Sequence, residues 1–393
     1  MNDIAVISFP DLNHLPSLIQ GDLTGKEGSN RAPIDNCQIE ADSDFAAINT
    51  WLLEYKDSPS TYRVYQKEVE RLLLWCLYQH KKPLSSLKRD DFECYIEFLK
   101  NPQPRSLWCG SKGGRGQTRG SAKWKPFTSP LNAGSLTTAI TIINSMMTYL
   151  VDAGYLQANP LRLLRKARRQ PHFEERKLDV QARILEKEEW QAMLQTLQDL
   201  PEEEPHDKDE KYRLRFIVGM LFFLGLRVGE LTTHTWQAFR QIEGQWWFIV
   251  KGKGNKWGKI PINQNLFDIA TQFRTHLRLP PIPQVSDNFP LVCSWRSTKG
   301  LTARYINYLL KDLALRTVQT YFKDDAAKQA KLAQFSAHWL RHLSATLQDR
   351  AGVKFSHIRA NLRHESDETT RLYVHAEDAL RHADMEKIEW VIK

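Results

Sequence analysis

The chain contains few cysteines, and none of them stands in a metal-binding or disulfide-like spacing. Its 393 residues include five cysteines, which are Cys37, Cys76, Cys94, Cys109 and Cys293. Because no pair forms a C-x-x-C motif, the sequence indicates neither a disulfide framework nor a zinc cluster. We expect reduced thiols, most of them buried, and no bound metal.

Three further features are missing, and each absence argues against a class of protein. No run of about 18 or more apolar residues occurs, so no membrane-spanning helix is predicted. The N-terminal sequence MNDIAVISFPDLNH lacks the basic, apolar and cleavage-site regions of a signal peptide. The phosphate-binding motif G-x-x-x-x-G-K followed by Ser or Thr is also missing, which argues against a nucleotide-driven motor. We therefore expect a soluble, cytoplasmic protein whose chemistry needs neither ATP nor a cofactor.

What the chain does have is an excess of positive charge. It holds 55 Lys and Arg against 46 Asp and Glu, a formal net charge of +9. Since charged residues make up an ordinary 26% of the chain, this surplus is superimposed on a globular composition and indicates a polyanionic partner. Nucleic acid fits best, and an anionic membrane surface is the alternative.

The length and the spacing of apolar residues predict two ordinary domains. Residues 1–40 contain several prolines and glycines with little periodicity, which predicts a loosely ordered leader. Over residues 41–158 apolar side chains recur at helical spacing, as in Tyr65, Val69 and Leu72, and predict a bundle of about four helices. A basic linker is expected over residues 159–181 and a second domain over residues 182–393.

The second domain is expected to be mainly α-helical with one small antiparallel β-sheet. The apolar run Phe216–Leu224 predicts a buried helix that ends near Arg227. Two short strands, Trp246–Lys251 and Lys256–Ile262, are predicted on either side of a glycine-containing turn. An acidic loop is expected at 202–210, and further helices at about 186–197, 264–277, 301–316, 338–349, 355–361 and 367–373.

Two basic segments are candidates for contact with DNA. The glycine-rich segment Pro104–Pro126 holds no acid and interleaves Trp108 and Trp124 with basic residues, which is typical of a mobile loop that wraps a phosphate backbone. A solvated surface insertion is the alternative there, and a solvated helix end is the alternative for the basic linker. The candidate DNA-binding residues are Arg105, Lys112, Arg115, Arg119, Arg165, Lys166, Arg168 and Arg169.

The chemistry-bearing residues form an ordered set of short motifs. These are Gly225-Leu226-Arg227-Val228-Gly229-Glu230-Leu231, Val250-Lys251-Gly252-Lys253-Gly254-Asn255-Lys256, His338-Trp339-Leu340-Arg341-His342, Leu362-Arg363-His364 and Tyr373. An isolated H-x-x-R arises by chance about once in a chain of this length, but the complete ordered set does not. Guanidinium groups bind the non-bridging oxygens of a phosphate bidentately. Arg227 and Arg341 therefore predict a phosphate-binding cage, with Tyr373 as its nucleophile.

The order and spacing of these motifs resemble those of the tyrosine recombinase (phage integrase) family, over about residues 41–393. The resemblance implies a helical core-binding (SAM-like) domain and a catalytic domain that together form a C-shaped DNA clamp. It also implies site-specific recombination through a covalent 3′-phosphotyrosyl intermediate, in the integration, excision or resolution of a DNA element. The expected partners are double-stranded DNA recombination sites, three further copies of the chain in a homotetramer, and accessory DNA-bending factors, with the protein associated with the nucleoid.

The same resemblance assigns a role to each site residue. Arg227 and Arg341 bind the scissile phosphate, and Tyr373 attacks it. Lys253 is aligned with the general acid that protonates the leaving 5′ oxygen, and Lys251, Lys256 and Lys259 are competitors for this role. The supporting residues are His338 and His364, which contact the phosphate or handle the tyrosine proton, Glu230, which orients Arg227, and His342, which packs beneath Arg341.

The chain departs from the family pattern at several places, and two other functions stay open. Arg363 stands where the family usually has glycine, which adds a cation near the site. Trp339 and the segment Thr317–Gln334 are also unusual. The alternatives are a topoisomerase-like protein that nicks and reseals DNA, and a DNA-binding regulator without activity. The apolar residues of Glu377–Lys393 have helical spacing and suit docking on a neighbouring subunit or on their own domain.

Overall fold

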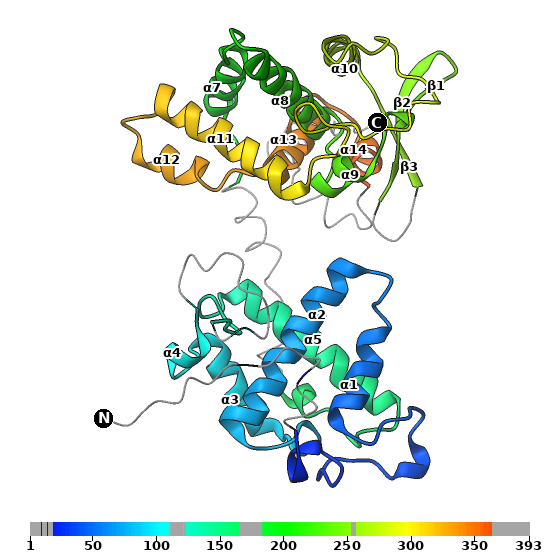
Figure 1. The fold of residues 1–393 in the computed structure, drawn as a ribbon, viewed down its shortest axis with the longest axis vertical. Helices are drawn as coiled ribbons and strands as arrows, with labels where there is room; N and C mark the ends of the chain where they lie inside the picture. The colour runs from blue at the N-terminus through cyan, green and yellow to red at the C-terminus, as the bar shows by residue number, and fades with distance from the viewer. Residues whose placement is uncertain are drawn as a thin grey trace, which may run out of the picture. The chain divides into compact units, whose positions relative to one another are not determined.

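The computed structural model describes residues 9, 14, 19–110, 121, 123–164, 183–252 and 257–363. The chain divides into two compact units, residues 1–170 and 171–393, and each has its own hydrophobic core. Each unit consists mainly of helices, and the second contains one small sheet (Figure 1). The expected fold class, mainly α-helical with a small antiparallel sheet, is confirmed. The finer division at residues 40, 158 and 181 stays a prediction.

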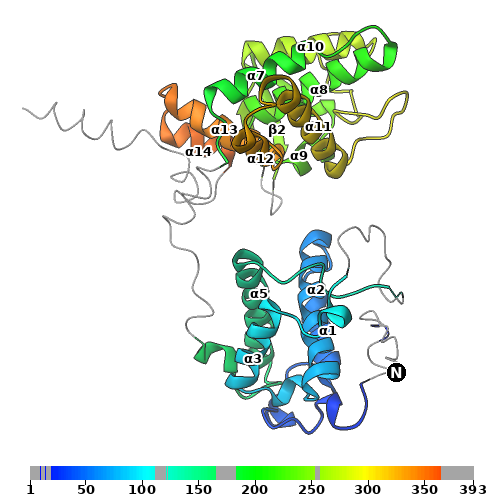
Figure 2. The same ribbon diagram turned by 90° about the vertical axis from the view of Figure 1, so that its left-hand side faces the viewer.

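The first unit is built on a helical bundle. Its helices are α1 (Asp44–Leu53), α2 (Pro59–Leu74), α3 (Arg89–Lys100), α4 (Arg105–Trp108) and α5 (Ala133–Asp152). Helix α2 begins with Pro59, where the missing N–H costs no hydrogen bond, and the Asn132 side chain caps α5 by accepting from the N–H of Ser135. Helix α5 contacts both α1 and α2 (Figure 2).

Part of the segment expected to be a loose leader is packed on this bundle. The Asn30 N–H donates to the Ser85 carbonyl at 2.8 Å, and the Asn30 side chain exchanges hydrogen bonds with the backbone of Ala158. Arg31 pairs with Leu156 in an isolated β-bridge. Residues 19–40 therefore differ from the expected loose leader, because their backbone groups find partners far along the chain that local periodicity does not reveal.

The basic segment Pro104–Pro126 also differs from the expected mobile loop, at both of its ends. Trp108 is 0% exposed and packs against Phe98, at 4.8 Å between ring centroids, and against Phe127. The N–H of Gly110 donates to the carbonyl of Phe127 at 2.8 Å. Trp108 is thus a core residue and not part of a mobile DNA-contacting loop, because its large ring is buried in an aromatic cluster. Arg105 is exposed on α4.

The remaining DNA-binding candidates, Lys112, Arg115, Arg119, Arg165, Lys166, Arg168 and Arg169, lie outside the described residues.

All five cysteines lie within the described part of the chain, and none forms a disulfide. Cys76 is buried and Cys94 is exposed, while the other three are partly exposed. The expectation of mostly buried thiols is therefore wrong except for Cys76, whose pKa is raised by burial. Within the described ranges no group of three or more potential ligands could hold a metal ion. No helix in those ranges has the length and apolar character needed to cross a membrane.

The second unit places helices around a three-stranded sheet. Its helices are α7 (Lys187–Gln198), α8 (Pro205–Phe223), α9 (Val228–Thr233), α10 (Gln264–His276), α11 (Ala303–Tyr321), α12 (Ala326–Leu332), α13 (Ala337–Arg350) and α14 (Phe355–Leu362). The strands β1 (Phe239–Ile242), β2 (Gln245–Lys251) and β3 (Trp257–Pro261) are antiparallel in the order β1-β2-β3.

Two details of the second unit differ from the sequence-based expectation. Strand β1 was not predicted, because its four residues, FRQI, alternate too briefly to give a signal. The acidic segment 202–210 is only partly a loop, since α8 begins at Pro205. A proline at the first helical position and Asp207 in the first turn both favour a helix start there.

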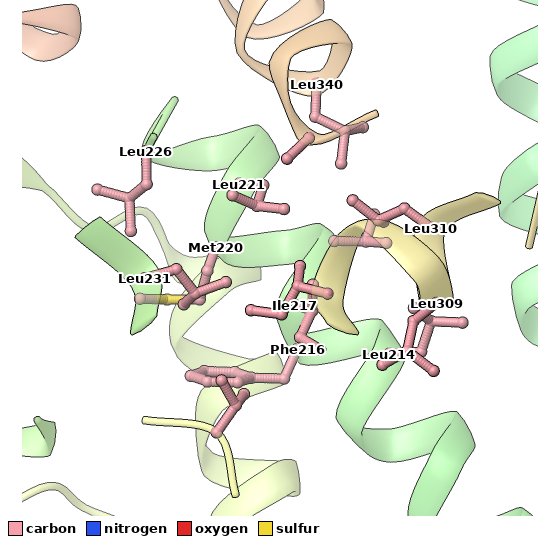
Figure 3. Close-up of a cluster of buried hydrophobic side chains, with 14 of the residues drawn as sticks. Leu214, Phe216, Ile217, Met220, Leu221, Leu226, Leu231, Leu309, Leu310 and Leu340 are labelled. Atoms are coloured by element: carbon pink, nitrogen blue, oxygen red, sulfur yellow. The ribbon is translucent and has the colours of Figure 1, made fainter. Parts of the chain in front are cut away.

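Helix α8 lies at the centre of the second core. Its residues Ile217, Met220 and Leu221 lie among Leu310 of α11 and Leu340 of α13 (Figure 3). Each of these side chains is at most 1% exposed. Burial on this scale holds the end of α8 rigidly, so the turn that follows it, and with it Arg227, has a defined position relative to α11 and α13.

Candidate active site

Arg227 stands at the start of α9, directly after the turn that ends α8. Its backbone N–H donates to Glu230 Oε2 at 2.8 Å, and its Nη1 donates to Glu230 Oε1 at 3.0 Å. The Arg227 side chain is 43% exposed, whereas that of Glu230 is 7% exposed. Glu230 therefore holds one edge of the Arg227 guanidinium and leaves the side chain open to solvent on the other side.

The turn before Arg227 depends on Gly225. This residue has φ +54°, in the left-handed region, and a Cβ added to it would lie 2.5 Å from Leu362 Cδ2. We expect Gly225→Ala to lower the free energy of unfolding by about 1–3 kcal/mol, because it adds both backbone strain and a clash. Denaturant unfolding measures this change. Gly229→Ala is the matched control, since nothing lies within 4 Å of its Cβ position. An equal loss in both variants would contradict the account.

Arg341 and His338 lie three residues apart on α13 and so share a face of that helix. Arg341 is 3% exposed, and its guanidinium donates hydrogen bonds to the carbonyl oxygens of Gly225 and Leu362. Gly225 follows α8 and Leu362 ends α14, so one side chain connects three segments. Arg341 thereby fixes the beginning of the Arg227 motif beside α13 and holds the end of α14 against both.

An open pocket of about 400 Å³ lies between α9, α11 and α13. Its polar and charged lining comes from Arg227, Asn307, Lys311, Ser336 and His338. Sequence reasoning missed Lys311, because its position four residues after Asn307 on α11 gives no sign that both face Arg227. Asn307 also accepts the N–H of Ala337 at 3.1 Å, which attaches α11 to the start of α13. A pocket lined by two cations and an imidazole suits an anionic group such as a phosphodiester.

The electrostatics of this pocket act on His338. Packing of the protein around its ring, and the positive charges of Arg341, Arg183 and Arg227, lower the pKa of His338 below the ordinary histidine value. The ring lies 4.0 Å, between centroids, from that of His342, which is 1% exposed. A lowered pKa means that His338 is mainly neutral at pH 7, with one nitrogen able to donate a hydrogen bond and the other able to accept one.

Removing one of the neighbouring positive charges should raise the pKa of His338. We therefore expect the His338 ring of Arg227→Gln to titrate at a higher pH than that of the wild type, measured by NMR on histidine-labelled protein. The sign follows because a nearby cation disfavours the protonated ring. Arg278→Gln, which changes an exposed arginine after α10, should not change the pH at which the His338 ring titrates. A downward shift in Arg227→Gln, or an equal shift in both variants, would refute the charge coupling.

The base of the β2–β3 hairpin is connected to α9 through a residue that sequence reasoning also missed. His234 Nδ1 lies 2.7 Å from the Glu230 carbonyl oxygen and must donate to it, and His234 Nε2 accepts the N–H of Lys251 at 2.8 Å. Lys251 ends β2, and Lys259 of β3 has its Nζ 4.6 Å from the Trp247 ring centroid. The imidazole thus joins the helix that begins at Arg227 to the strand that leads into the hairpin.

The other predicted site residues, Lys253, Lys256, His364 and Tyr373, lie outside the described residues. Of the predicted set, the structure brings together Arg227, Glu230, His338, Arg341 and His342. The described residues nearest to the others along the chain are Gly252, which follows β2, Trp257, which begins β3, and Arg363, which follows α14.

The chain is similar to known proteins over most of its second unit. The model of the phage integrase family matches residues 183–379. Tyrosine recombinase XerC of Vibrio cholerae serotype O1 is 26% identical over 245 residues, which cover 62% of this chain and 68% of XerC. XerC of Caldanaerobacter subterraneus subsp. tengcongensis is 30% identical over 166 residues, covering 42% of this chain and 41% of that one.

Solved structures show a similar fold. The Tn1549 transposon integrase in complex with a circular intermediate DNA gives a TM-score of 0.56 at 13% identity, covering 87% of this chain and 98% of that one. The XerH site-specific recombinase bound to its difH substrate gives 0.55 at 15% identity, covering 86% and 83%. The family match spans the Arg227 motif, the hairpin, α13 and Tyr373. The chain belongs to the phage integrase family and is a tyrosine recombinase, an enzyme for site-specific cleavage and rejoining of DNA.

Proposed function

We propose that the pocket between α9, α11 and α13 binds the scissile phosphate of a DNA recombination site. The observation that carries this proposal is that Arg227 and His338 line one open pocket while Arg341, on the same helix as His338, holds the turn before Arg227. Guanidinium groups keep their charge at any working pH and match the oxygens of a phosphate, so they stabilise the negative charge that builds up during attack. Lys311 adds a further cation to the same lining.

The chemical step that we propose is attack of the Tyr373 hydroxyl oxygen on phosphorus. The new P–O bond to tyrosine forms as the P–O5′ bond breaks, and Lys253 gives a proton to the leaving 5′ oxygen. A neutral imidazole such as that of His338 can accept the proton that the tyrosine loses. Since the phosphotyrosyl bond conserves the energy of the broken bond, a 5′ hydroxyl can reverse the step without ATP, metal or water.

We further propose that the substrate is a pair of duplex recombination sites held by a homotetramer, with both units of the chain contacting DNA as a clamp. Integration, excision or resolution of a DNA element fits this activity, and accessory DNA-bending factors are compatible with it. The neighbours support the DNA substrate, since XerH, the Tn1549 integrase and a lambda integrase dimer were each solved with DNA. Arg105, exposed on α4, and the basic residues of the linker are the proposed backbone contacts outside the pocket.

Covalent trapping tests this function. The substrate is a nicked duplex that contains the cognate site. After cleavage, the short fragment that carries the free 5′ hydroxyl dissociates, so religation is blocked and the protein stays attached to the DNA. In EDTA and without ATP, we expect the wild-type chain to form a complex that survives denaturing electrophoresis. If the protein becomes trapped on the nicked duplex but never exchanges strands between two intact sites, the topoisomerase-like alternative is favoured. If the protein binds the site but never becomes attached, the regulator alternative is favoured.

A further inference from the structure

Arg363 occupies a backbone position that favours glycine. It ends α14 with φ +54° and ψ +46°, in the left-handed region. A side chain there is disfavoured, so an arginine at this position needs compensating contacts. Arg363 has them, because its side chain is 12% exposed, its Nη2 lies 2.7 Å from Glu230 Oε2, and its Nη1 donates to the Asn361 carbonyl at 2.7 Å.

Glu230 is therefore shared between two arginines. Its Oε2 accepts from Arg363 and from the backbone N–H of Arg227, and its Oε1 accepts from the Arg227 side chain. Burial opposes the charge on Glu230, but Arg363 and then Arg227 outweigh it, so the pKa of this carboxyl is lowered. A carboxylate bound by Arg227 alone would cancel the charge of the arginine. With Arg363 present, the trio keeps one net positive charge beside the pocket.

Arg363 also lies between the other parts of the site. The residue before it, Leu362, gives its carbonyl oxygen to Arg341. Strand β3 passes close to its side chain, since a Cβ on Gly258 would lie 3.2 Å from Arg363 Cδ. The end of α14 thus contacts the Arg341 side chain through Leu362, and the Arg227 motif and β3 through Arg363. Because residues 362 and 363 contact all three, the position of α14 and the positions of the Arg341 side chain, the Arg227 motif and β3 depend on one another.

We propose that Arg363 is a positioning residue that holds Glu230, and through it the Arg227 guanidinium, in the geometry for phosphate binding. This inference rests on the proposed function of the pocket. Arg363→Lys would keep a positive charge beside Glu230, and Arg363→Met would keep much of the side-chain length without that charge. Without Arg363, the side chains of Glu230 and Arg227 would form an isolated ion pair, and this pair could move relative to the pocket.

The test compares Arg363→Met and Arg363→Lys in the full chain, with cleavage of the nicked duplex measured at saturating DNA. Arg363→Met should cleave about 10–100-fold more slowly, the range typical of residues that orient a direct ligand. Arg363→Lys should recover most of this loss. In a Glu230→Gln background, Arg363→Met should slow cleavage by less than threefold, because the charged partner of Arg363 is already gone. Arg350→Met, at an exposed end of α13, controls for the loss of one charge.

A second readout needs no activity. The Nε–H resonance of Arg227, identified by its loss in Arg227→Lys, should be sharp in the wild type and in Arg363→Lys, and broadened in Arg363→Met. If Arg363→Met cleaves like the wild type with an unchanged resonance, the positioning role is refuted while the proposed function stands. Equal losses in the Lys and Met variants would also refute it. If the wild type itself traps no DNA, the proposed function fails, and the resonance alone then decides whether Arg363 orders Arg227.

Discussion

Tyr373→Phe should form no covalent DNA complex, while its affinity for the duplex site stays within about threefold of the wild type. The substitution removes only the oxygen that attacks phosphorus, and no other group in the proposed mechanism replaces it. Binding is distributed over many phosphate contacts, so the loss of one hydroxyl has little effect on it. Trapping on the nicked duplex and a binding titration at fixed salt measure the two quantities separately.

Tyr321→Phe is the matched control for this substitution. Tyr321 ends α11 in the same unit and is 42% exposed, so it is accessible to solvent but belongs to none of the site motifs. We expect it to trap DNA as the wild type does. Trapping by Tyr373→Phe at the wild-type rate would show that Tyr373 is not the nucleophile, and peptide mapping of the covalent complex would then identify the tyrosine that is.

Arg341→Ala should lose both cleavage and stability. Removing a donor that stabilises the transition-state charge typically costs about 10²–10³-fold in rate, and two arginines acting together can make the loss larger. The same substitution leaves the carbonyls of Gly225 and Leu362 without their buried partner, which should lower the free energy of unfolding by about 2–5 kcal/mol. Single-turnover cleavage and denaturant unfolding measure the two effects. DNA binding should stay within about tenfold under conditions where the variant is folded.

Arg227→Ala should separate the effect on cleavage from the effect on stability, which Arg341→Ala combines. Its side chain is 43% exposed and paired only with Glu230 among the ion pairs and hydrogen bonds described for it. We expect a cleavage defect similar to that of Arg341→Ala, with less than about 1 kcal/mol of lost stability.

If Arg341→Ala were as stable as the wild type, the bonds to Gly225 and Leu362 would not contribute as argued. If it cleaved within tenfold of the wild type, Arg341 would not belong to the phosphate cage.

Much of the second unit could be predicted because its signals are local. The apolar spacing of α8 and α13 and the two strands around residues 252–256 follow from backbone periodicity and turn chemistry over a few residues. The Arg227 and Arg341 motifs, too, were recognisable as an ordered set. The order of these motifs was enough to indicate the family, and the match of the family model to residues 183–379 confirms it.

The sequence by itself therefore determined the fold class and the family, and it supplied the candidate site residues as predictions. Only the tertiary structure decided how those residues are held: Arg341 bonds to Gly225 across 116 residues, and Arg363 to Glu230 across 133. It also moved Trp108 into the core and brought Lys311 into the Arg227 pocket. The physical reason is that such contacts depend on how packed helices bring distant side chains together, and no local pattern of residues encodes that meeting.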